Sequence, residues 1–269
     1  MPKLSISQAW DETRAILARD GKLLVSVALA LIVLPQTILG VAGIPRADEK
    51  SLLASFSMML VVLIGLAAQV ALNRLSIGPA ITVAGAIGRG FRRLGPLVVA
   101  LILIGLALLV ALTLIAFTLG ALRLITIPAP GQPPTPALIA VLVLCLVLAS
   151  AAFQLVLPVA AAEAGGPIKL LSRSWALARE NYLRLLAFVA VIFLAALVVV
   201  LATQAVIGSV VVVTLGKPVA GSISALVFAF LTALIQSIFT IVASVMLARI
   251  YTQLAGGREA QASVPSSGI

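Results

Sequence analysis

The sequence contains no histidine, a single cysteine and few charged residues. Without histidine, the chain lacks the side chain that most often ligates metals or transfers protons near neutral pH. The cysteine, Cys145, has no second thiol in the chain with which to form an intramolecular disulfide. It lies within an apolar run, where we expect it to pack as a hydrophobic residue rather than to react.

Motifs of catalysis and cofactor binding are also missing. The 8 acidic residues form no pair inside an apolar run. No metal-ligand spacing, phosphate-binding loop or nucleophile elbow occurs. We therefore predict that the chain is not an enzyme and that it holds no cofactor and no metal.

Charge is scarce because the chain is strongly apolar. Charged residues make up 10% of the sequence, against about 25% in a soluble domain, and the mean hydropathy is +1.27. A helix needs about 20 apolar residues to cross a bilayer. The sequence predicts an all-α polytopic membrane bundle with transmembrane helices near residues 23–43, 51–73, 96–120, 137–160, 184–213 and 222–249. These lie in one membrane domain over residues 1–250, and we expect residues 251–269 to form a disordered cytoplasmic tail.

The basic residues are distributed unevenly between the two ends of these helices. Most of the 18 lie in the N-terminal segment, in the loops after the second and fourth helices, and in the tail. The opposite side has only Arg46, Lys50, Arg123 and Lys217. The positive-inside rule then predicts that both termini lie in the cytoplasm. This topology accounts for the net charge of +10 without a nucleic-acid partner.

One basic segment, "GGPIKLLSRSWALARENYLRLL" (165–186), interrupts the apolar pattern. Apolar and aromatic residues at steps of three or four form one helical stripe: Ile168, Leu171, Trp175, Ala178 and Tyr182. Lys169, Arg173 and Arg179 fall toward its flanks and far side. A helix with this distribution lies in the membrane interface. We expect its basic side chains to contact anionic lipids of the cytoplasmic leaflet.

Two further basic segments, 7–24 and 84–97, precede the first and third predicted transmembrane helices in the same way. The motif Ser-x-x-Trp ends at Trp10 in the first and at Trp175 in the segment described above, but the rest of the two segments does not align. The architecture predicts parallel repeat units over residues 1–73, 74–160 and 161–250, each a surface helix followed by two transmembrane helices. A pseudo-threefold bundle is the arrangement we expect.

Pro158, Glu163 and the run Arg173-Ser174-Trp175 resemble the membrane-domain family of glycerophosphoryl diester phosphodiesterases. The resemblance is sharpest over residues 155–200. It implies a six-span bacterial inner-membrane protein, and most members are of unknown function. The family name comes from members that carry a separate soluble phosphodiesterase domain. This sequence contains no such domain, so the resemblance does not imply that activity.

Glu163 is the one acidic residue that stands at the end of a predicted transmembrane helix and next to a basic segment. We expect a structural ion pair with Arg173, Arg184 or the Arg92–Arg93 pair, and the alternative is a site for an ion or a lipid head group. The residues that we consider candidates for structural or lipid-interface roles are Trp10, Arg92, Arg93, Glu163, Arg173, Trp175, Arg179 and Arg184.

Amide side chains occur inside several predicted transmembrane helices, at Gln69, Gln154, Gln204 and Gln236. We expect them to form hydrogen bonds between helices, and the alternative is that they line a polar path. The leading functional hypothesis is a non-enzymatic protein that organises the membrane or envelope, or acts as a scaffold. A transporter or lipid-handling protein is the alternative, and a lipid-modifying enzyme acting through Glu163 comes third.

Overall fold

The computed structural model describes residues 4–42, 52–78, 82–123, 132 and 135–262. Every regular element within these ranges is helical, which confirms the predicted all-α class. Six helical stretches among the described residues are long and apolar enough to cross a membrane. The fold is therefore compatible with a multi-pass membrane protein.

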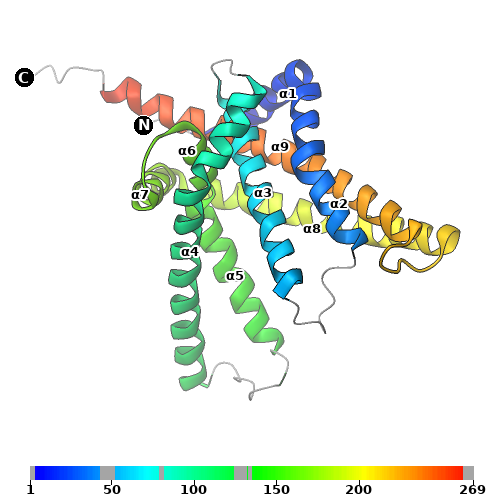
Figure 1. The fold of residues 1–269 in the computed structure, drawn as a ribbon. Coiled ribbons are helices and arrows are strands. Elements are labelled where there is room, and N and C mark those ends of the chain that lie inside the picture. Colours follow the sequence, from blue (N-terminus) through cyan, green and yellow to red (C-terminus); the bar gives the residue numbers. More distant parts are fainter. Residues whose placement is uncertain (1–3, 43–51, 79–81, 124–131, 133–134, 263–269) are drawn as a thin grey trace, which may run out of the picture.

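The helices follow one another in antiparallel pairs along the chain (Figure 1). The first candidate transmembrane helix combines α1 (Ile6–Ala28), a π-helical turn η1 (Leu29–Val33) and α2 (Leu34–Val41). The next elements are α3 (Leu52–Ile77), α4 (Val83–Ala121), α5 (Pro136–Phe153) and α6 (Val156–Ala162). The chain then forms α7 (Pro167–Ala178), a 3-10 turn η2 (Arg179–Asn181), α8 (Tyr182–Leu215) and α9 (Ile223–Ala262).

These bounds differ from the predicted ones at the two basic segments and at the C-terminal end of the last helix. The basic segments 7–24 and 84–97 are not separate surface helices, because each continues without a break into the helix that follows. Residues 251–262, predicted to belong to a disordered tail, form the last turns of α9. Leu254 is only 2% exposed, so burial of its side chain stabilises helix beyond the apolar run. Residues 263–269 lie outside the described residues.

Proline residues explain the interruptions in two of the long helices. Proline has no backbone N–H, and its ring clashes with the carbonyl group four residues earlier. Pro158 lies four residues after Gln154, where a turn separates α5 from α6. Pro35 follows η1 directly, and there the N–H of Leu34 bonds to the Leu29 carbonyl in the wider π-helical pattern. Pro96 lies within α4, which continues through it without a break.

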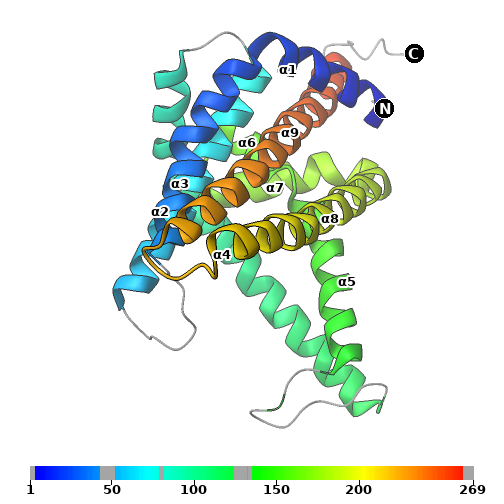
Figure 2. The same cartoon turned by 90° about the vertical axis from the view of Figure 1, so that its right-hand side faces the viewer.

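Helix α9 occupies the centre of the molecule and contacts α1, α2, α3 and α8. Figures 1 and 2 show that the α4–α5 pair extends in one direction from this centre and that α8 and α9 extend in another. The ends of these pairs carry exposed apolar side chains, such as Phe117, which is 70% exposed. A lipid environment would receive these side chains without the cost that water imposes. The predicted threefold repeat stays a prediction.

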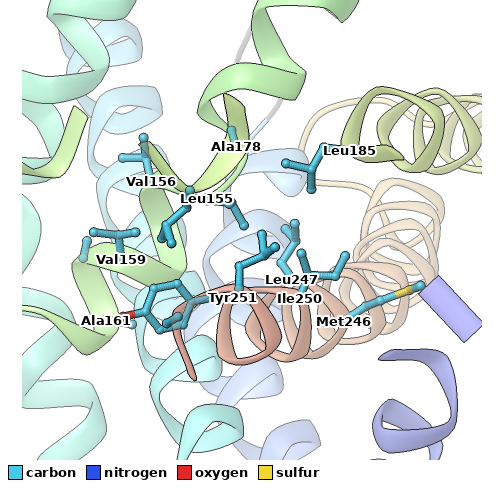
Figure 3. Packing of buried hydrophobic residues seen from close by; sticks show 14 of the residues in the cluster. Leu155, Val156, Val159, Ala161, Ala178, Leu185, Met246, Leu247, Ile250 and Tyr251 are labelled. Atoms are coloured by element: carbon cyan, nitrogen blue, oxygen red, sulfur yellow. The ribbon is translucent and has the colours of Figure 1, made fainter. Parts of the chain in front are cut away.

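The main core lies where α6, α7, α8 and α9 converge (Figure 3). Leu155, Leu185 and Ile250 are fully buried and come from three separate parts of the chain. A second buried cluster, which includes Leu24, Leu72 and Val245, joins α1, α3 and α9. Packing is therefore concentrated at one end of the helices and in the contacts of α9.

Helices α3 and α4 approach each other closely because small residues face each other. A Cβ atom on Gly90 would collide with the carbonyl oxygen of Ala67 on α3. Ala86, one turn before Gly90, is fully buried, as are Ala67 and Ala71. Small residues spaced four apart are a common way for membrane helices to bring their backbones together.

Candidate functional site

Basic segments that are distant in sequence meet at one end of the molecule, which we call the basic end. It contains the first residues of α1, the C-terminal end of α3, the start of α4, the α6–α7 junction and the C-terminal part of α9. Hydrogen bonds described below join these parts across separations of 72 to 248 residues. The uneven charge distribution in the sequence therefore corresponds to a single region of the structure.

Arginine side chains at the basic end donate to backbone carbonyl groups at the ends of helices. Arg89 Nη1 lies 3.1 Å from the Ala161 oxygen and 3.5 Å from the Ala162 oxygen at the end of α6. Arg93 Nη1 lies 3.4 Å from the Gly165 oxygen. The last carbonyl groups of a helix have no intrahelical donor, and the helix dipole favours a cation beside them. These contacts hold α4 against the α6–α7 junction.

The end of α3 is capped in the same way from two directions. Arg74 Nη1 donates to the Gly78 carbonyl at 3.0 Å, and Arg249 Nη2 donates to the Ser76 carbonyl. Arg249 Nη1 also lies 3.8 Å from a carboxylate oxygen of Glu12. Arg249 thus joins α1, α3 and α9 with one side chain.

The N-terminal segment is held at the basic end by polar contacts of its backbone. Arg184 Nη1 donates to the Leu4 carbonyl at 2.9 Å, and the Leu4 N–H donates to Asn181 Oδ1 at 3.4 Å. The Ser5 N–H donates to Gln253 Oε1 at 3.3 Å. Arg184, which we considered as a partner of Glu163, therefore binds the chain start instead.

Glu163 forms the predicted ion pair, and its partner is Arg173. Arg173 Nε donates to Glu163 Oε1 at 2.8 Å, and both side chains are half-buried. Tyr251 Oη donates to the same oxygen at 3.0 Å. The carboxylate therefore links the end of α6 to α7 and to α9. Sequence reasoning missed Tyr251, which lies 88 residues from Glu163 and carries no local signal for this role.

Positive charge exceeds negative charge around the start of α4. The ion pairs within the described ranges include Arg19–Asp20, Arg173–Glu163 and Arg249–Glu12. None of them involves Arg74, Arg89 or Arg93, which have carbonyl partners instead. Arg89 is close enough to Arg74 for the two like charges to repel each other. Sequence reasoning included Arg93 among the candidates but not Arg74 or Arg89.

Helix α7 has a buried face, and the apolar stripe predicted from the sequence lies partly on it. Leu170, Ser174 and Leu177 face the core, which the sequence pattern did not single out. On the predicted stripe, Ile168 and Trp175 are 74% and 48% exposed. Ala178 on the same stripe is fully buried, and Leu171 and Tyr182 are half-buried, so the stripe predicted as one exposed face is only partly exposed. The Trp175 ring lies 6.4 Å from that of Phe153 on α5, measured between centroids.

The remaining candidates lie on the outer surface of the basic end. Trp10 is 45% exposed on α1. Arg179 is exposed in η2. Arg92 is also exposed, and its Nε donates to the Gly88 carbonyl one turn earlier at 3.3 Å. The structure therefore separates Arg92 from Arg93, which bonds to the α6–α7 junction.

The glutamines do not form the predicted links between helices. Gln69, Gln154 and Gln236 are half-buried, Gln204 is exposed, and none makes a side-chain hydrogen bond to another described residue. A pocket of about 700 Å³ lies between α5 and α8, but residues such as Val143 and Phe193 make its lining apolar. In the part of the chain that the structure describes, no group of three or more histidine, cysteine or acidic residues is placed to hold a metal ion.

Fold and site together define an all-helical protein whose long apolar helices converge on an arginine-rich end. Residues 4–254 match the family described as a domain of unknown function (DUF7847), and the chain belongs to this family. No curated protein and no solved structure matches the chain. The resemblance to the phosphodiesterase membrane-domain family stays a prediction, since the match to DUF7847 does not link the two.

Proposed function

We propose that the chain is a non-enzymatic, multi-pass protein of a bacterial inner membrane that organises the membrane or serves as a scaffold there. In this proposal both termini and the basic end lie at the cytoplasmic leaflet. The observation that carries it is the convergence of the basic segments at one end of six apolar helices. An arginine or lysine at the bilayer centre costs about 2.5–3.5 kcal/mol, whereas anionic lipid attracts it at the surface.

In the same proposal α7 lies in the plane of the membrane interface. Its exposed side carries Ile168 and Trp175, and Lys169 and Arg179 are exposed beside them. Tryptophan is favoured at this depth because its ring is mostly apolar and its N–H can reach water. The Glu163–Arg173 pair would then set the orientation of α7 relative to α6.

Cysteine labelling in intact cells tests the orientation. In a Cys145→Ala background, cysteine replaces either Ser172 on α7 or Ala220 in the α8–α9 connection, both of which are exposed. We expect a membrane-impermeant maleimide to label the variant at position 220 in intact cells. The variant at position 172 should react only after the membrane is permeabilised, and the opposite pattern would refute the orientation.

Fluorescence quenching tests the depth of α7. With Trp10→Phe, Trp175 becomes the only tryptophan in the chain. In reconstituted vesicles we expect stronger quenching by lipids labelled near the head group than by lipids labelled at the end of the acyl chain. The Trp175→Phe variant, which retains Trp10, serves as the control for the quenchers. Strong quenching of Trp175 by aqueous iodide, together with no quenching by either labelled lipid, would contradict an interfacial helix.

The pocket between α5 and α8 supports a second candidate function in lipid handling. Its apolar lining, which includes Ile139, Val143 and Leu194, suits an acyl chain rather than a polar cargo. Replacing Val143 with tryptophan would fill it, and the matched change at Leu109, an exposed position on α4, would not. Transfer of fluorescent phospholipid between vesicles would distinguish the functions, because only a lipid-handling protein accelerates it and loses that activity when the pocket is filled.

A further inference from the structure

We propose that Arg74, Arg89 and Arg93 form a binding site for the phosphate group of an anionic phospholipid. This proposal deepens the membrane-organising function proposed above and rests on the basic end lying at a membrane surface. The three side chains come from the end of α3 and the start of α4 and are half-buried. The sequence analysis named Arg93 among its candidates for lipid contact but did not name Arg74 or Arg89.

The first argument is charge balance. Each of these guanidinium groups has a neutral carbonyl partner, and no described acidic residue forms an ion pair with any of them. The acidic residue at the α6–α7 junction, Glu163, is already bound by Arg173 and Tyr251. An anion would therefore relieve the repulsion between Arg74 and Arg89.

The second argument is an unused donor. Nε of Arg74 is buried and has no hydrogen-bond partner, although Nη1 of the same residue bonds to the Gly78 carbonyl. A buried donor without an acceptor is unfavourable, and a guanidinium group offers phosphate two parallel donors. A phosphate oxygen would supply the acceptor that the protein does not.

The position of these arginines along α3 and α4 favours a lipid over free phosphate as the ligand. Arg89 and Arg93 lie in the second and third turns of α4, where the helix is packed against α3 and the α6–α7 junction. Beyond them, α4 presents exposed apolar side chains at Val99 and Ile102. A phospholipid whose head group is bound by these arginines would have its acyl chains at the level of this apolar surface. Basic pockets between membrane helices bind anionic head groups in this way.

Native mass spectrometry of the full chain in nanodiscs tests the proposal, with phosphatidylglycerol as the anionic probe and phosphatidylcholine as the neutral one. We expect the wild-type protein to retain phosphatidylglycerol preferentially. In the variant Arg74→Gln/Arg89→Gln, the ratio of retained phosphatidylglycerol to phosphatidylcholine should fall by about tenfold or more. The control Arg14→Gln/Lys22→Gln removes the same charge from exposed positions on α1 and should keep the preference within about twofold.

Several outcomes would overturn the site. An equal loss in the control would show general surface attraction, and an unchanged preference in Arg74→Gln/Arg89→Gln would exclude these residues. If inorganic phosphate displaced the lipid and stabilised the delipidated protein equally well, the ligand would be free phosphate. Should the double variant not fold, Arg74→Gln alone carries the test, because its guanidinium bonds only to its own helix end.

Native mass spectrometry and the cysteine labelling described above together separate this site from the proposed orientation. A wild-type preference for phosphatidylglycerol together with labelling of position 172 from outside the cell would refute the orientation and leave the site intact. Correct labelling together with no wild-type preference would refute the site alone.

Discussion

Replacing Gly90 with leucine should prevent α3 and α4 from packing, and we expect this to be the most disruptive single change in the protein. Even a Cβ atom at this position would collide with the carbonyl oxygen of Ala67, and a backbone atom cannot move aside as a flexible side chain can. Overpacking of this kind costs about 3 kcal/mol. Thermal unfolding and size-exclusion chromatography in detergent would measure the loss.

Gly88→Leu provides the matched control for this prediction. Gly88 lies on the same helix two residues earlier, and a Cβ atom there would meet nothing within 4 Å. Leucine also has a higher helix propensity than glycine by roughly 1 kcal/mol, so the control should be neutral or stabilising. Equal loss of folded protein in both variants would show that the close approach of α3 and α4 is not the cause.

Replacing Glu163 with alanine should reduce the stability of the folded protein by about 1–2 kcal/mol. The change removes the acceptor for Arg173 Nε and for Tyr251 Oη, and hydrogen bonds to charged groups are worth about 1.5–3 kcal/mol when well shielded from solvent. We take a lower value because the ion pair is only half-buried. The melting temperature and the folded yield in detergent provide the measurement.

Glu163→Gln keeps an oxygen acceptor and removes the charge, so its loss should be smaller than that of the alanine variant. In a double-mutant cycle, Glu163→Ala and Arg173→Ala should be less than additive, since each removes the same pair. If Glu163→Ala preserved the melting temperature and yield but weakened phosphatidylglycerol binding, the carboxylate would act in a ligand site rather than as a structural link.

The fold class and the positions of the long helices could be predicted because each depends on a local property. A run such as 96–120 is apolar throughout, and a backbone in lipid must satisfy its own hydrogen bonds, so it has to be helical. The structure places helix over this run as part of Val83–Ala121. The ion pair of Glu163 was also predictable, because Arg173 lies only ten residues away.

The contacts of the basic end could not be predicted to the same degree. Arg89 bonds to Ala161 and Arg184 bonds to Leu4, and these separations of 72 and 180 residues leave no periodic signal in the sequence. The continuous helices at 7–24 and 84–97 were also missed, because a basic amphipathic segment can form a separate surface helix or extend the helix that follows it. Packing of buried residues such as Ala9 and Ala86 decides between the two.

By itself, the amino-acid sequence determined that this protein is helical, that it is suited to a bilayer and that its positive charge lies between particular helices. These properties follow from hydropathy and charge, which act residue by residue. Only the tertiary structure decided which arginines face carbonyl groups, that Tyr251 shares Glu163 with Arg173, and that Arg74 and Arg89 lie together without an acidic partner. Side-chain contacts of this kind depend on how the helices cross, and that geometry is set by packing across the whole chain.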